Sequence, residues 1–168
     1  MSGKIILHHA APSRSSTACW CGPVPSSLLF MLEEVGVPYD LRVLDLQAGD
    51  QLKPAFLAIN PMGKVPTIEH DGVVITEVGA ICTYLADAFP AAGLAPPVND
   101  PMRGPYLRWM FFQGNCLEPA IVDHALKREP GNRAMMPYGD YETAVGAVEK
   151  TIEKGPWFLG DRYSAADV

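Results

Sequence analysis

Residues 60–85 read NPMGKVPTIEHDGVVITEVGAICTYL and carry the most informative pattern in this 168-residue chain. Two apolar runs of strand character meet there at His70-Asp71-Gly72, and Asp-Gly between such runs is a strong signal for a β-hairpin. Val65-Pro66 starts the first strand, and Thr76-Glu77 marks the change from the second strand to a helix. A free strand edge beside a helix N-terminus suits a small, anionic, peptide-like ligand.

The segments on either side of this stretch complete a small α/β domain. A β-branched and apolar run over residues 4–9 predicts a buried first strand, and residues 28–35 repeat apolar side chains at helical spacing. Residues 39–46 alternate as a strand does, and residues 51–59 hold a short helical piece. The apolar positions over residues 77–89 return to helical period. The predicted order is therefore β-α-β-α-β-β-α.

A second domain is predicted after a segment that is dense in Pro, Gly and Ala. Strand signals disappear beyond it, whereas residues 106–117 and 141–152 both show helical periodicity. We expect an α/β domain over residues 1–89, a linker over 90–100 and a helical domain over 101–168.

The last residues carry the signals that begin a helix. Ser164 suits an N-cap, Asp167 completes a capping box, and Tyr163 and Val168 are placed for a hydrophobic staple. A helix that is so fully capped needs about ten further residues to be stable. These signals predict that the helical domain is incomplete at Val168.

Composition limits the classes of partner. The net charge of -6 argues against nucleic acid, and no apolar run approaches the roughly 20 residues that a membrane span needs. The apolar run Ile5-Ile6-Leu7 is too short for the core of a signal peptide, and His8 and His9 interrupt it. We therefore expect a cytoplasmic protein that binds neither nucleic acid nor membrane.

The four cysteines indicate neither a metal site nor a disulfide framework. Cys19, Cys21, Cys82 and Cys116 are widely spread, and the His8-His9 pair lacks a second ligand pair at metal-like spacing. In a reducing cytosol they are expected to be thiols. Cys82 and Cys116 fall among apolar helical positions and are predicted to lie in the core.

Four motifs occur in order along the chain: LEEVGVPY at 32–39, NPMGKVP at 60–66, Thr76-Glu77, and GDRYSAAD at 160–167. Together they resemble the cytosolic, bacterial-type glutathione S-transferase family from about Lys4 onward. The resemblance implies a thioredoxin-like domain followed by a helical domain, a homodimer, and a role in detoxification. It also implies that glutathione and a small apolar electrophile bind in the cleft between the domains.

The resemblance assigns the middle of a glutathione site to the residues around Val65. In this family the bond before Pro66 is cis, which leaves the N–H and C=O of Val65 facing outward to pair with the cysteinyl backbone of glutathione. Lys64 matches a position that can meet the glycyl carboxylate. The alternatives are a plain turn proline at Pro66 and a solvated side chain at Lys64.

The γ-glutamyl end of the ligand is assigned to Glu77 and Val78. The backbone N–H groups of both residues point at its carboxylate, and the Glu77 side chain can meet its amine. Family members usually carry Ser at the position of Val78, so this chain lacks one hydroxyl donor. A charge-assisted hydrogen bond contributes about 1.5–3 kcal/mol, so the affinity for glutathione is expected to fall by roughly tenfold or more. Alternatively, Glu77 is simply an acid at a helix N-terminus.

Activation of the thiol has two candidates. A thiol with a pKa near 8.5 is only about 3% thiolate at neutral pH, and a hydroxyl that donates to the anion lowers that pKa. Residues 8–16 look like the strand-to-loop segment of the family, which makes Ser13 the first candidate and Ser15 the second. Residues 17–31, however, form a longer connection than the family has, and counting back from the following motif points to Cys21 instead.

Cys21 lacks the second Cys of a dithiol motif, so it would support only monothiol chemistry with glutathione. Alternatively, Cys21 is a small apolar side chain that fills space in an inserted loop and has no catalytic role. Aromatic and Met side chains of the helical domain can line the electrophile pocket, although such a stripe is more often core: Tyr106, Trp109, Met110 and Phe112.

We therefore predict a glutathione S-transferase that stabilises the thiolate of its co-substrate from Ser13. A glutathione-dependent monothiol oxidoreductase that uses Cys21 is one alternative. A non-enzymatic relative that keeps the fold for binding or assembly is another. Val78, the long connection and the expected missing end after Val168 favour it.

Overall fold

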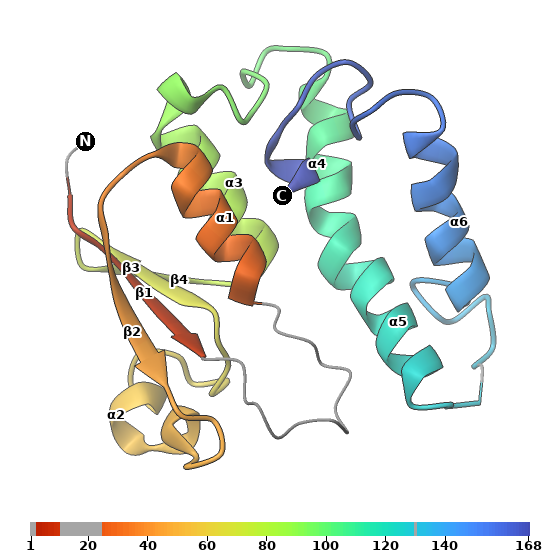
Figure 1. Ribbon diagram of the computed structural model, residues 1–168. Coiled ribbons are helices and arrows are strands. Elements are labelled where there is room, and N and C mark those ends of the chain that lie inside the picture. Colours follow the sequence, from red (N-terminus) through yellow and green to blue (C-terminus); the bar gives the residue numbers. More distant parts are fainter. Residues whose placement is uncertain (1–2, 11–24, 130) are drawn as a thin grey trace. The chain divides into compact units, whose positions relative to one another are not determined.

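A computed structural model describes residues 3–10, 25–129 and 131–168. The chain forms two compact units, Met1–Ala92 and Gly93–Val168, and the division falls inside the Pro-, Gly- and Ala-rich segment (Figure 1). Within the described residues, no helix has both the length and the apolar character to cross a membrane.

The first unit is built on a four-stranded mixed sheet with the order β2-β1-β3-β4. Its strands are β1 (Ile5–Ala10), β2 (Tyr39–Leu44), β3 (Thr67–His70) and β4 (Val73–Thr76). β1 runs parallel to β2, and β3 runs antiparallel to both β1 and β4. The parallel pair requires a crossover, which α1 (Pro25–Val35) supplies.

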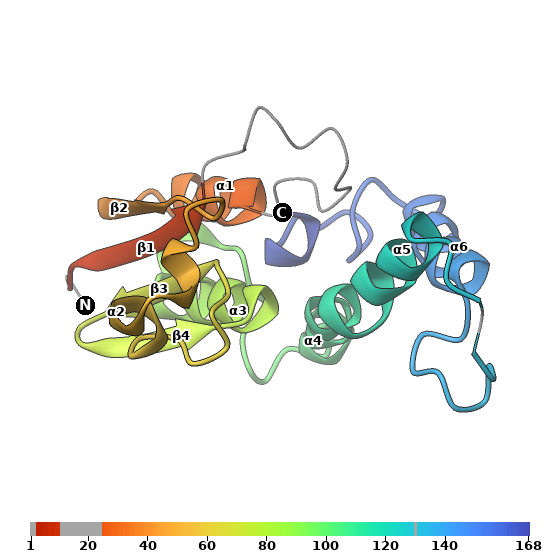
Figure 2. The same cartoon turned by 90° about the horizontal axis from the view of Figure 1, so that it is seen from below.

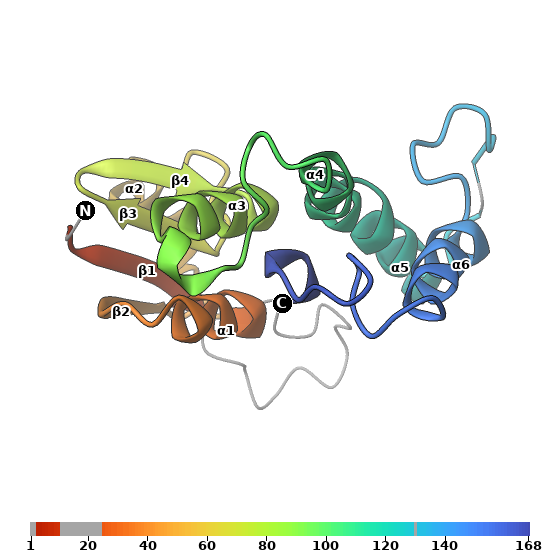
Figure 3. The ribbon, with the colours of Figure 1, turned by 90° about the horizontal axis from the view of Figure 1, so that it is seen from above.

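Helices cover both faces of this sheet. α1 and α3 (Val78–Ala88) lie side by side over one face, as Figure 3 shows, and α2 (Pro54–Leu57) with the short 3-10 turn Asp50–Leu52 lies over the other face (Figure 2). The predicted β-α-β-α-β-β-α order and the thioredoxin-like first domain are confirmed.

The core of the first unit lies between the sheet and the α1–α3 layer. The alternation along β1 places Ile5 and Leu7 against the helices, with both side chains fully buried. The side chains that meet them are also fully buried and come from α1, β3 and α3: Leu28, Met31, Leu32, Ile68, Ile81 and Leu85.

The hairpin that the Asp-Gly pair predicts is confirmed. β3 and β4 pair from Thr67↔Thr76 to His70↔Val73, and the connection is Asp71-Gly72. Asp71 has φ 51° and Gly72 has φ 79°, the pair of positive values that a type I′ turn needs. The turn therefore fixes the register of the two strands.

The second unit is helical, as predicted. Its helices are α4 (Arg103–Phe112), α5 (Glu118–Ala125) and α6 (Tyr141–Ile152), and the π-helical segment Gln113–Leu117 joins the first two. The prediction for α6 is confirmed at its bounds. The prediction over 106–117 is wrong in extent, because α4 begins earlier and the helical path continues through α5.

Prolines lie at the starts of α4 and α5. Pro105 is in the first turn of α4, where a backbone N–H has no intrahelical acceptor. Pro119 is the second residue of α5, directly after the π-helical segment. The predicted capping box is confirmed: Ser164 Oγ accepts from the Ala166 N–H at 3.3 Å, and Asp167 Oδ2 accepts from the Ser164 N–H at 2.9 Å.

Leu85→Ala tests the α1–α3 layer. Because Leu85 is fully buried, its truncation leaves a cavity that should lower the free energy of unfolding by about 2–5 kcal/mol. The matched change Leu52→Ala removes a side chain that is 63% exposed and should cost no more than about 0.5 kcal/mol. Urea denaturation measures both, and equal effects would contradict this packing.

Candidate functional site

The strand register brings the predicted ligand-binding segments together at one end of the sheet, where β3 begins and β4 stops. Thr67 opens β3 opposite Thr76, the last residue of β4. Pro66 directly precedes Thr67 and Glu77 directly follows Thr76, so both segments leave the sheet at this paired position. β1 pairs His8 with Thr67, so the carboxyl end of β1 reaches the same end of the sheet. Two segments that the sequence singled out separately are therefore neighbours.

Val65 and Pro66 lie between α2 and β3. The peptide bond between them is cis, as the family resemblance implies. Val65 is half-buried, and within the described part of the chain neither its N–H nor its C=O has a hydrogen-bond partner. These groups can pair with an extended peptide, since an unpaired strand edge offers the same pattern of donors and acceptors.

Glu77 is the N-cap of α3 and has an unusual backbone conformation, with φ 67° and ψ 120°. Such a conformation costs a residue other than glycine on the order of 1–3 kcal/mol, and strain of this kind clusters at ligand-binding sites. The Glu77 side chain is exposed and makes no capping hydrogen bond. The first N–H groups of α3, which begins at Val78, therefore remain open to an anion.

Of the other residues assigned to the site, Lys64 lies in the described part of the structure and four do not. The Lys64 side chain is exposed, which allows either of its two interpretations. Ser13, Ser15, Cys19 and Cys21 lie outside the described residues, so their assignments stay predictions.

His9 is a buried polar residue near this end of the sheet that the sequence analysis did not assign. It lies next to the last residue of β1, is 6% exposed, and its Nδ1 has no partner in the described structure. Burial lowers the pKa of the imidazole, because desolvation disfavours the charged ring. The signal in the sequence was a His inside an apolar strand, which by itself does not distinguish a surface from a core position.

The two described cysteines differ in environment. Cys82 is buried in α3, as predicted, and burial raises the pKa of its thiol to about 12. The core prediction for Cys116 is wrong: this residue lies in the π-helical segment and is partly exposed, with its Sγ 3.7 Å from the Pro137 carbonyl oxygen. The wider turn there rotates Cys116 away from the position that α-helical spacing predicts.

The aromatic stripe of the second unit belongs mainly to its core. Tyr106, Trp109 and Met110 are buried, and Phe112 is half-buried. The Trp109 ring packs against Phe158 with a centroid distance of 4.5 Å. These contacts favour the core interpretation of the stripe over a ligand-lining one.

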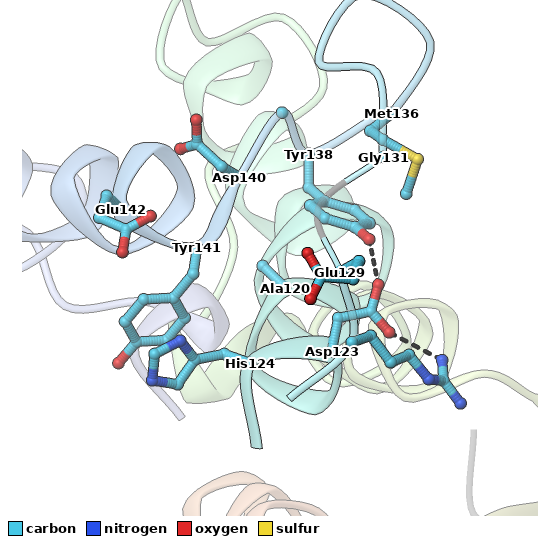
Figure 4. Close-up of a pocket in the computed structure, with 12 residues that line it drawn as sticks. Ala120, Asp123, His124, Glu129, Gly131, Met136, Tyr138, Asp140, Tyr141 and Glu142 are labelled. Atoms are coloured by element: carbon cyan, nitrogen blue, oxygen red, sulfur yellow. Dashed lines mark hydrogen bonds and ion pairs between the residues drawn. The ribbon is translucent and has the colours of Figure 1, made fainter. Parts of the chain in front are cut away.

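A pocket of about 270 Å³ opens in the second unit between α5, the following loop and the start of α6. Figure 4 shows the His124 ring stacked on the Tyr141 ring and the Asp123 carboxylate hydrogen-bonded to the Tyr138 hydroxyl. The two ring centroids lie 3.9 Å apart, and Arg128 Nη1 lies 2.7 Å from Asp123 Oδ1. Its described lining has four carboxylates and a single Arg: Asp123, Glu129, Asp140, Glu142 and Arg128. This excess of negative charge disfavours an anionic ligand. The segment around Val65 and the start of α3 is therefore the better candidate site for an anion.

Within the described residues, no group of three or more His, Cys, Asp or Glu side chains could hold a metal ion.

Known proteins are similar to this chain in sequence and in fold. The family model "Glutathione S-transferase, N-terminal domain" matches residues 22–88. The disulfide-bond oxidoreductase YfcG of Escherichia coli is 31% identical over 166 residues, covering 87% of this chain and 73% of that protein. The chain belongs to the glutathione S-transferase family. The family predicted from the four motifs is therefore confirmed, and relatives that are named transferases support the predicted class of enzyme.

Other members of the glutathione S-transferase family align over nearly the whole chain. Glutathione S-transferase 3 of Schizosaccharomyces pombe is 29% identical over 181 residues, covering 97% of this chain and 70% of that protein. A glutathione transferase of Burkholderia graminis is 28% identical with a TM-score of 0.74, covering 98% of this chain and 68% of that one. Its crystal structure holds two glutathione molecules per subunit.

The environments of the two cysteines predict different reactivity. Treatment of the folded protein with iodoacetamide at neutral pH should modify Cys116 and leave Cys82 unmodified, because a buried thiol with a pKa of about 12 is almost entirely protonated. Peptide mass spectrometry distinguishes the two sites, and urea should make both react. Modification of both at similar rates without urea would contradict the burial of Cys82.

Proposed function

We propose that this chain is a glutathione S-transferase that binds glutathione along Val65 and at the N-terminus of α3. The open backbone of Val65, together with the first turn of α3 that no side chain caps, is the observation that carries the proposal. Glutathione is a peptide with carboxylates at its ends, so a free strand edge meets its backbone and a helix N-terminus meets an anion. Lys64 provides a cation for the glycyl carboxylate.

The chemistry requires the glutathione thiol as its anion. In the proposed mechanism the Ser13 hydroxyl donates a hydrogen bond to the sulfur, which favours the thiolate. The thiolate forms a carbon–sulfur bond with a small apolar electrophile, which expels a leaving group or takes up a proton. Holding both reactants in place lowers the barrier, since the encounter no longer carries its entropy cost in the chemical step.

Val78 is expected to reduce the affinity for glutathione without abolishing it. A Val at this position keeps the backbone N–H and lacks the hydroxyl that family members usually supply with Ser. The exposed Glu77 side chain remains available to the amine of the ligand. We therefore expect weaker binding than in a relative with Ser here.

A glutathione-dependent oxidoreductase is the second candidate, because YfcG is named a disulfide-bond oxidoreductase. In this version the Cys21 thiolate attacks a glutathione mixed disulfide, takes the glutathionyl group and releases the other thiol. A second glutathione then attacks the Cys21 disulfide and leaves as oxidised glutathione, restoring the thiolate. A non-enzymatic relative that only binds or assembles is the third candidate.

The wider setting of the proposal follows the family resemblance. It comprises a glutathione-binding domain over residues 1–89, a linker over 90–100 and a helical domain over 101–168. In this proposal the protein forms a homodimer, is located in the cytoplasm and acts in detoxification.

Two substitutions distinguish the candidates. Ser13→Ala should lower the rate of glutathione conjugation to an aryl halide by about 100-fold, within the range for loss of one anion-stabilising donor, while Cys21→Ser leaves it unchanged. The same proteins are assayed for reduction of a glutathione mixed disulfide. Loss of that reaction in Cys21→Ser alone, with conjugation absent throughout, would move the function to thiol exchange.

Calorimetry of the unsubstituted protein is the control for both assays. Heat of binding with millimolar glutathione is expected. If no binding is detected, both enzymatic candidates fail and the non-enzymatic one remains.

A further inference from the structure

Asn60 is the buried centre of the loop that carries Val65. Its side chain is 4% exposed, and both ends of its amide are hydrogen-bonded. The Oδ1 atom accepts from the Met62 N–H at 3.0 Å, and Nδ2 donates to the Lys64 carbonyl at 2.8 Å and to Thr67 Oγ1 at 3.1 Å. Because Met62 offers a donor, the atom that faces it must be the oxygen, which fixes the orientation of the amide.

Thr67 acts on the same carbonyl. Its hydroxyl receives one N–H from Asn60 and donates its own hydrogen to the Lys64 carbonyl at 3.1 Å. Thr67 is fully buried, so these groups have no water to replace the partners that they would lose. The Lys64 carbonyl is therefore held by two buried side chains.

The direction of that carbonyl determines the direction of the Val65 N–H. Both groups belong to the Lys64–Val65 peptide bond, which is trans, whereas the next bond is the cis Val65–Pro66. A trans peptide is planar, and its C=O and N–H point in opposite directions. Since the carbonyl points toward Asn60 and Thr67, the Val65 N–H points away from them.

The turn before Lys64 restricts the loop further. The Gly63 N–H donates to the Asn60 carbonyl at 2.9 Å, and Gly63 has φ 61°. A Cβ on Gly63 would lie 3.0 Å from the Gln51 carbonyl oxygen, so this residue packs directly against the 3-10 turn. The loop is thereby fixed at Gly63 as well as at the Lys64 carbonyl.

We propose that Asn60 and Thr67 are positioning residues that hold the Lys64–Val65 peptide plane so that the Val65 N–H is presented to glutathione. The inference rests on the proposed glutathione site and assigns two residues that do not touch the ligand. A rotated plane would turn the donor away from the cysteinyl carbonyl of glutathione and leave the rest of the site unchanged.

Thr67→Val removes the hydroxyl and keeps the shape of the side chain. By calorimetry we expect its Kd for glutathione to rise about fivefold, as for loss of one neutral hydrogen bond, and that of Asn60→Ala to rise about tenfold or more. Thr67→Ser keeps the hydroxyl and should bind as the unsubstituted protein does.

Thr83→Val is the matched control. The Thr83 hydroxyl also donates to a backbone carbonyl of the first unit, that of Gly79 at 2.7 Å, but Thr83 is half-buried whereas Thr67 is fully buried. This variant should lose some thermal stability and keep its Kd for glutathione. If lost stability alone weakened binding, Thr83→Val would bind glutathione less tightly as well.

Two outcomes would overturn the proposal. If the unsubstituted protein binds glutathione and Thr67→Val binds it equally well, the positioning role is wrong and the glutathione site stands. If the unsubstituted protein binds no glutathione, the proposed function and this role both fail.

Discussion

β3 is hydrogen-bonded on both sides, to β1 and to β4, and the candidate site depends on where this strand begins. Thr67 is the first residue of β3 and pairs with His8 on one side and Thr76 on the other. The same residue sends its hydroxyl back to the Lys64 carbonyl. The start of one central strand therefore determines the position of Val65, the approach to Glu77 and the orientation of the peptide plane between Lys64 and Val65.

Recognition in this account is carried mainly by the backbone. In the proposed site, the Val65 N–H and C=O and the first N–H groups of α3 are available to a ligand whatever side chains these residues bear. A Val at position 78 in place of the family's usual Ser therefore keeps the backbone part of the site. Side chains contribute by holding the backbone, as Asn60 does, or by adding charge at the rim, as Lys64 and Glu77 do. The strained backbone of Glu77 agrees with recognition by the backbone, because strain of this kind clusters at ligand-binding sites.

The sequence predicted those features that local chemistry determines. The Asp71-Gly72 turn and the Ser164–Asp167 capping box each depend on residues within a few positions, and both were found. The order of α and β elements followed from periodicity alone. The pairing of Thr67 with Thr76, which brings Pro66 and Glu77 to the same end of the sheet, followed from the hairpin.

Features that depend on tertiary context were missed. The helical path extends beyond the predicted 106–117 at both ends, and Cys116 lies in the π-helical segment outside the predicted core. The burial of His9 depends on elements that pack over the sheet, which the sequence of β1 alone does not reveal. The Asn60–Lys64–Thr67 hydrogen bonds need a folded loop, so the motif revealed the family without revealing how Asn60 acts.

The central claim is that the Val65 backbone is an open edge for glutathione. The most direct measurement is the amide spectrum of the 15N-labelled protein during a titration with glutathione. The Val65 N–H should show one of the largest shifts and exchange its hydrogen more slowly in the complex, with smaller changes at Glu77 and Val78. Shifts confined to the residues that line the acidic pocket, or an unchanged Val65 signal at saturating glutathione, would contradict the account.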